Sequence, residues 1–306
     1  MTAFLCHYYD LVLAPGLPDR QLIVRYQKIA AGTDRAPDQY RLLVPKAVLF
    51  LTHLTLSALE SVVIVSDGAC LIIGGLYLAR MLRRRPPGSI LIALLYVSGF
   101  AVTVMLFPRP ETFPAFLAST CLLGTYIRPG RAHAALGMAG GVVLAGCRPE
   151  MAIAAAVLFA LRWHDRNVLM RLAFASVLVI LGIAGVIIPR HLYPDTTYMT
   201  DLVQIRYNLD PRHLLIVTAL LAPVFAFITR SGLRSSAPIL AWVATQLTMI
   251  FIVGRVDEAR ILFPLSGALA LVLADVYSAF RAEQGRSTEV ASQIIQGDPL
   301  EAWPRK

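Results

Sequence analysis

The chain has 306 residues, of which 57% are hydrophobic and only 15% charged, and its mean hydropathy is +0.65. These values exclude an ordinary soluble domain. The formal net charge of +9 comes from basic residues that cluster in alternate loops, which a membrane explains better than nucleic acid does. The composition therefore predicts a protein whose partner is the lipid bilayer, with no nucleic-acid partner.

Residues 1–59 are predicted to form an N-terminal segment of polar and interfacial character. Residues 1–16 have neither a basic start nor a small-residue cleavage site, so we do not interpret them as a signal peptide. The polar residues 17–46 include a Gly-, Asp- and Pro-rich turn at 32–37. Residues 42–59 are apolar, and we expect helices that lie at the membrane interface. In the competing interpretation this stretch is itself a crossing.

Residues 60–280 are predicted to form an all-α, polytopic transmembrane bundle of about nine membrane helices, because apolar runs recur near the length that crosses about 30 Å of hydrocarbon. The runs lack the alternation of a membrane barrel. The predicted crossings cover residues 60–81, 86–108, 112–127, 132–147, 151–161, 172–188, 213–229, 238–253 and 261–280. Residues 281–306 are expected to form a flexible cytoplasmic tail.

The distribution of basic residues predicts the orientation of the bundle. From residue 80 onward, fifteen of the 22 Lys and Arg residues fall in the loops of one side or in the tail. The positive-inside rule places that side in the cytoplasm. The N-terminal segment then lies at the outer face of a cell membrane, and we expect a multi-pass protein of the bacterial inner membrane.

Two copies of one triplet, Arg109-Pro110-Glu111 and Arg148-Pro149-Glu150, each join two apolar runs. The sequence thus predicts a repeated helical hairpin with this triplet at each tip. The runs of 16 and 11 residues that follow span only about 24 and 17 Å, so we expect re-entrant-like tips below the outer surface of the membrane. Charges at that depth are costly and usually functional or paired. The alternative is ordinary helix-start chemistry, in which Arg and Glu pair within one tip.

A family resemblance appears in three short motifs. They are the stretch from Asp38 to Pro45 (Asp-Gln-Tyr-Arg-Leu-Leu-Val-Pro), the Arg-Pro-Glu tips, and Glu258-Ala259-Arg260 before Phe263-Pro264. Together they resemble the C-type integral-membrane glycosyltransferases. The resemblance implies a polyprenyl-phosphate sugar as donor, action at the outer face, and a catalytic acid in the first outer loop. That class usually begins with a transmembrane helix, which we would expect upstream of Met1.

The expected chemistry needs cations for a lipid phosphate and a carboxylate for the acceptor hydroxyl. Asp38 is the first candidate for the base and Asp34 the second, the alternative being plain loop solvation. The predicted binding residues of the charged tips and the first outer loop are Arg41, Arg109, Glu111, Arg148, Glu150, Arg255, Asp257, Glu258 and Arg260. The acidic members of this set would support the arginines or contact a metal. No spacing specifies a metal, but Mg or Mn would suit oxygen ligands.

Two other functions fit the same residues. A transporter or flippase for a lipid-linked saccharide could use the arginines without chemistry, and a non-catalytic membrane subunit would need neither substrate nor base.

Overall fold

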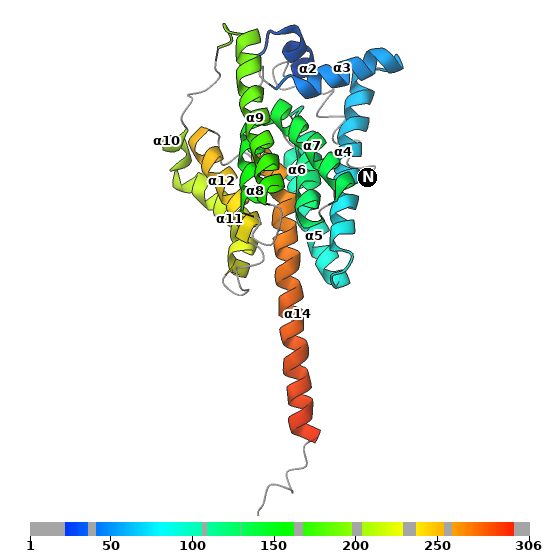
Figure 1. Cartoon of the computed structure of the whole chain (residues 1–306), viewed down its shortest axis with the longest axis vertical. Helices are drawn as coiled ribbons and strands as arrows, with labels where there is room; N and C mark the ends of the chain where they lie inside the picture. Colours follow the sequence, from blue (N-terminus) through cyan, green and yellow to red (C-terminus); the bar gives the residue numbers. More distant parts are fainter. Residues whose placement is uncertain are drawn as a thin grey trace, which may run out of the picture.

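The structure is a computed structural model that describes residues 22–35, 41–105, 109–128, 130–161, 168–197, 204–228, 237–253 and 259–296. Within these ranges the chain is helical and contains no strand (Figure 1). The predicted all-α fold is confirmed. Three helices are long and apolar enough to cross a membrane, namely Leu59–Leu82, Val168–Leu192 and Phe263–Gly285. Several apolar helices are shorter, so the count of about nine crossings stays a prediction.

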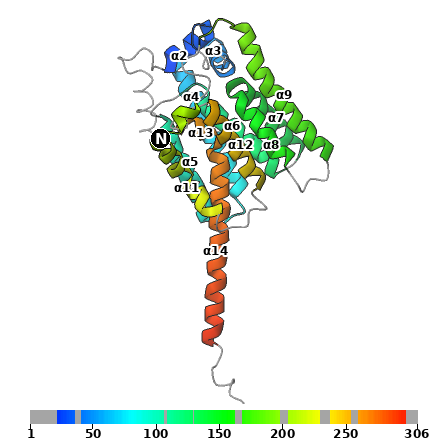
Figure 2. The same cartoon turned by 90° about the vertical axis from the view of Figure 1, so that its left-hand side faces the viewer.

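The N-terminal helices α2 (Leu22–Ala31) and α3 (Leu43–Thr55) lie at one end of the bundle, opposite the end from which α14 projects (Figures 1 and 2). Helix α2 is amphipathic and buries four residues of one face, Leu22, Ile23, Tyr26 and Ile29. It ends at Gly32, whose φ of 77° suits glycine at a helix C-terminus.

Helix α3 runs across the end of α4 (Leu59–Leu82) rather than along it (Figure 1). It exposes a set of large apolar side chains, including Phe50 and Leu54, and ends at Leu56. The structure thus separates α3 from α4 near residue 57. An exposed apolar face of this kind fits a helix that lies in a membrane interface.

Four helices pack against one another in chain order, namely α6 (Thr112–Ile127), α7 (Arg131–Cys147), α8 (Pro149–Ala160) and α9 (Val168–Leu192). These helices approach one another closely at glycines. A Cβ added to Gly140 of α7 would meet the carbonyl oxygen of Ala118 in α6 at 2.7 Å. A Cβ on Gly185 of α9 would collide with the carbonyl oxygen of Ala145 in α7. Small residues therefore permit the close backbone packing that membrane helices use.

The two predicted hairpins are not equivalent. Helices α7 and α8 pack against each other, as expected for a hairpin. In the first unit, α5 (Pro87–Met105) packs mainly on α14, whereas α6 packs on α4 and α7. The described residues of α5 and α6 share no extensive contact, so the prediction of a repeated hairpin is wrong for this unit. Helix α5 packs on α14 instead.

The C-terminal part contains α10 (Ile205–Asn208), α11 (Pro211–Ile228), α12 (Ala237–Val253), α13 (Ala259–Leu262), the 3-10 turn η2 (Phe263–Leu265) and α14 (Ser266–Gln296). Helix α14 continues without interruption past residue 280 and projects far beyond the bundle (Figures 1 and 2). The sequence analysis places a flexible tail from residue 281, whereas the structure is helical to Gln296.

Candidate functional site

The first Arg-Pro-Glu joint is tied to the N-terminal segment by an ion pair. A guanidinium nitrogen of Arg41 contacts Oε1 of Glu111, 70 positions further along the chain. The Glu111 side chain is only 2% exposed and that of Arg41 16%. Arg41 lies two residues before α3 begins at Leu43, and Glu111 directly precedes α6. This contact therefore fixes the start of the interfacial helix to the start of a core helix.

The second joint contains its own ion pair. Nη1 of Arg148 lies 3.2 Å from Oε1 of Glu150, two residues away. Arg148 is the single residue between α7 and α8, and Pro149 occupies the first turn of α8, where its missing N–H costs nothing. The Arg148 side chain is 4% exposed, whereas that of Glu150 is 26% exposed. Of the four charged side chains, Glu150 is therefore the one most accessible from outside.

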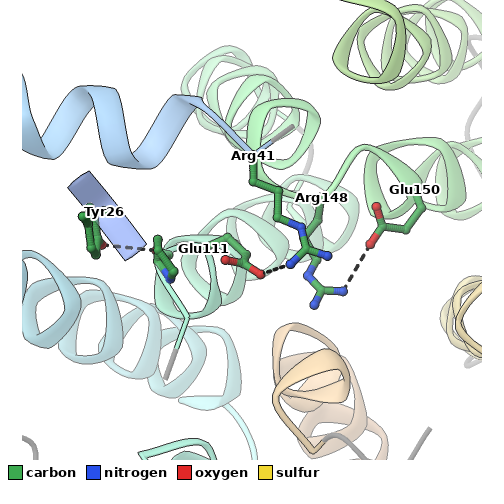
Figure 3. Close-up of polar contacts among 6 residues, drawn as sticks. Tyr26, Arg41, Glu111, Arg148 and Glu150 are labelled. Carbon is green, nitrogen blue, oxygen red and sulfur yellow. Dashed lines mark hydrogen bonds and ion pairs between the residues drawn. The ribbon is translucent and has the colours of Figure 1, made fainter. Parts of the chain in front are cut away.

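The two pairs form one charged cluster, defined here as Arg41, Glu111, Arg148 and Glu150. In the view of Figure 3 the two guanidinium groups lie between the two carboxylates. The structure thus brings together residues from three distant parts of the chain, which the sequence analysis expected to share one site.

The second joint lies well below the end of the bundle. Gly185 of α9 lies against Ala145 and Pro149, which flank the joint. Helix α9 continues to Leu192, about 10 Å further at 1.5 Å per residue. The 12 residues of α8 span only about 18 Å on the other side of the joint. The cluster is therefore recessed relative to the neighbouring helix.

Tyr26 and Asp67 border the cluster on its α2 side, and the sequence analysis assigned them no role. The Tyr26 hydroxyl lies 3.5 Å from the carbonyl oxygen of Pro110, inside the first triplet (Figure 3). Burial raises the pKa of Tyr26 well above its usual value, and the nearby Asp67 and Glu111 carboxylates raise it further. The phenol therefore stays neutral and can act as a hydrogen-bond donor.

Asp67 is 1% exposed and lies within α4, a candidate membrane span. A buried carboxylate in such a helix is costly and marks a functional or paired group. The signal was present in the sequence as a single carboxylate in the apolar run 61–79. Tyr26 could not be found this way, because nothing in its local sequence indicates the distant contact with Pro110.

The remaining predicted site residues divide into those the structure describes and those it does not. Arg109 is partly buried at the first joint, and its carbonyl oxygen accepts a hydrogen bond from the backbone N–H of Thr112. Asp34 follows α2, and its Oδ1 accepts a hydrogen bond from the backbone N–H of Arg35. Outside the described residues lie Asp38, Arg255, Asp257, Glu258 and the side chain of Arg260. The preferred base and the third charged tip therefore stay predictions.

The described residues contain no group of three or more His, Cys, Asp or Glu side chains that could hold a metal ion. In the cluster, each carboxylate already contacts a guanidinium. Binding of Mg or Mn therefore stays a prediction, and no chemical step below depends on it.

The cluster can bind an anion. Guanidinium groups form paired, charge-assisted hydrogen bonds with phosphate or carboxylate oxygens. In this structure each of the two arginines forms an ion pair with a glutamate. An incoming oxyanion would either displace the glutamates or bind the same arginines beside them. Comparisons with protein-family models, with curated proteins and with solved structures find no match for this chain.

Proposed function

We propose that this protein is a membrane glycosyltransferase that moves a sugar from a polyprenyl-phosphate donor to an acceptor at the outer face of the cell membrane. One observation carries the proposal. Arg41, which is partly buried, and Arg148, which is buried, converge with two glutamates among helices apolar enough for a membrane. A lipid-linked phosphate brings an anion to such a depth, whereas a soluble anion would have to enter apolar surroundings.

The reaction assigns a role to each kind of residue. The acceptor hydroxyl oxygen attacks the anomeric carbon, and the bond from that carbon to the phosphate oxygen breaks. The polyprenyl phosphate leaves with one additional negative charge, which Arg148 and Arg41 stabilise through preorganised hydrogen bonds. The acceptor proton passes to a carboxylate, for which Asp38 is the first candidate and Asp34 the second. Glu111 and Glu150 hold the guanidinium groups in place before the donor arrives.

The membrane placement belongs to the same proposal. The end of the bundle with α2, α3 and the two joints faces the outer compartment, and the loops rich in arginine face the cytoplasm. The protein is then a multi-pass component of a bacterial inner membrane. Its shorter helices, such as α8, reach the recessed joint rather than the full thickness of the bilayer.

Binding of the lipid phosphate that the donor and the leaving group share tests the proposal directly. Polyprenyl phosphate is titrated against the protein in lipid nanodiscs, and the double variant Arg148→Gln/Glu150→Gln is compared with the wild type. Changing both partners avoids an orphaned buried charge. Loss of a charge-assisted contact should weaken binding by about 10- to 100-fold.

The matched control is Arg85→Gln/Asp275→Gln, because this pair, with an N–O distance of 2.6 Å, joins the start of α5 to α14 away from the cluster. We expect the control to bind polyprenyl phosphate as the wild type does. Equal binding by wild type and the Arg148 variant would contradict the proposal.

A second measurement separates the enzyme from a transporter. Asp38→Asn should abolish sugar transfer while polyprenyl phosphate binding remains. A transporter would retain its saccharide flux in this variant. If Asp34 and Asp38 can both be changed without loss of transfer, the assignment of the base is wrong.

A further inference from the structure

Helix α12 carries two buried polar side chains with polar atoms that find no hydrogen-bond partner among the described residues. Trp242 and Gln246 lie one helical turn apart, and both are fully buried. Among the residues the structure describes, Nε1 of Trp242 and both amide atoms of Gln246 have no hydrogen-bond partner. Buried polar atoms in folded proteins are nearly always hydrogen-bonded, so these three atoms require an explanation.

The other buried positions of α12 show which type of residue packing alone favours. Ile239, Val243 and Ile250 occupy the same face and are apolar. Leucine has nearly the volume of glutamine and would fill position 246 without the desolvation cost. The amide at position 246 is therefore not explained by packing alone.

The position of α12 links these two side chains to the charged cluster. Its most extensive contact is with α8, the helix that begins at Arg148 and carries Glu150 in its first turn. The α8 residues that follow are small and buried, with alanine at 152 and at 154–156. Trp242 and Gln246 thus lie on the helix that packs against this alanine-rich part of the bundle.

The end of α12 is also held in place. The backbone N–H of Gln204 donates to the carbonyl oxygen of Ile252, and the side-chain amide of Asn208 donates to that of Phe251, both at 2.8 Å. These bonds satisfy carbonyls that a helix C-terminus otherwise leaves free. The C-terminal end of α12 is thereby anchored to α10, so Gln246 lies on a helix that is held in place, as a binding residue requires.

We propose that Trp242 and Gln246 bind hydroxyl groups of the saccharide carried by the lipid phosphate. This inference rests on the proposed function and names the part of the ligand that the α8–α12 contact recognises. The glutamine amide both accepts and donates, and the indole N–H donates. Sugar hydroxyls likewise donate and accept hydrogen bonds, whereas an ionised phosphate only accepts them and a polyprenyl chain can neither donate nor accept them. The phosphate lies at Arg148, on the side where Glu150 is accessible, and the sugar extends toward α12.

The experiment compares ligands with and without the sugar. Polyprenyl phosphate is titrated beside polyprenyl-phosphate glucose, mannose and arabinose, with the full-length protein in nanodiscs. We expect at least one sugar-bearing lipid to bind the wild type more tightly than polyprenyl phosphate. In Gln246→Leu that advantage should shrink by at least about fivefold, the value of one hydrogen bond, while polyprenyl phosphate binds unchanged.

Two further variants sharpen the result. Trp242→Phe keeps an aromatic ring but removes the N–H, so it should lose part of the same advantage. Thr248→Val alters an exposed residue of the same helix whose hydroxyl bonds to Ala244, and it should change nothing.

Thermal unfolding of the ligand-free protein gives an independent readout. Gln246→Leu should unfold at the same temperature as the wild type or higher, because it removes unsatisfied atoms. A clear fall in Tm would mean that the amide has an internal partner and would overturn the inference. So would a sugar advantage that survives in Gln246→Leu, or the absence of any such advantage in the wild type. Failure of the wild type to bind polyprenyl phosphate would instead refute the proposed function.

Discussion

Glu111 and Glu150 are each the last residue of an Arg-Pro-Glu triplet, but they form ion pairs with arginines in different parts of the chain. Glu111 is buried and reaches Arg41 in a remote segment, whereas Glu150 is partly exposed and pairs within its own triplet. The first joint also receives Tyr26 from α2, while the second is packed against Gly185 of α9.

The difference shows that a short motif does not determine its own role. The first joint connects the N-terminal helices to the bundle, so we expect it to contribute chiefly to stability. The second joint is complete in itself and more accessible, so we expect it to contribute chiefly to ligand binding. Variants at the two joints should therefore differ in what they change.

The largest effect is expected at the first joint. Glu111→Ala leaves the Arg41 guanidinium without its carboxylate in a largely buried site, which should destabilise the protein by about 3 kcal/mol. Thermal unfolding in nanodiscs and proteolysis of residues 22–41 measure the change. Adding Arg41→Gln should restore part of the loss. A stability loss no larger than that of Glu150→Ala would remove the distinction between the joints.

A second, smaller loss is expected at the packing of the other joint. Gly185→Ala places a Cβ against the Ala145 carbonyl and should cost about 1–3 kcal/mol through overpacking. Gly75→Ala is the control, because nothing lies within 4 Å of a Cβ there. Equal melting temperatures for the two variants would contradict the close approach of α9 to the joint.

The alkaline stability of the first joint depends on Tyr26. Because the folded-state pKa of Tyr26 is raised by burial and then by Asp67 and Glu111, the unfolded chain loses this proton first as the pH rises above about 10. Stability should therefore fall above that pH, and Tyr26→Phe should lessen the fall. Unfolding followed between pH 8 and 11 checks this, with Tyr193→Phe as the control near the same end of the molecule. An unchanged pH dependence in Tyr26→Phe would contradict it.

The smallest effect on stability is expected for Glu150→Gln, at most about 1 kcal/mol, because the carboxylate is partly solvated. Binding of polyprenyl phosphate should instead become several-fold tighter, since the phosphate no longer competes with Glu150 for Arg148. Weaker binding in this variant would show that Glu150 helps to hold the ligand.

The sequence predicted the helical membrane fold, the separation of residues 42–59 from the first long helix, and the charged joints, because these depend on local composition and run length. It did not predict that Glu111 pairs with Arg41, since the contact depends on how α3 packs on α4 and α7. Nor did the sequence predict that α5 and α6 share little contact, because this depends on the packing of α5 on the distant helix α14. The helical course of residues 281–296 was missed because a polar segment without a core-facing stripe gives little signal of helix.

The orientation of α3 has a mechanical consequence. We expect a helix whose exposed face carries Phe50 and Leu54 to lie at the boundary between headgroups and acyl chains, and Arg41 lies two residues before this helix begins. The position of Arg41 in the charged cluster then depends on the depth at which α3 lies in the bilayer. A thinner or thicker membrane would shift α3 relative to α6 and alter the geometry of the Arg41–Glu111 contact. The length of the lipid chains should therefore change the geometry of the charged cluster even where no lipid contacts its arginines.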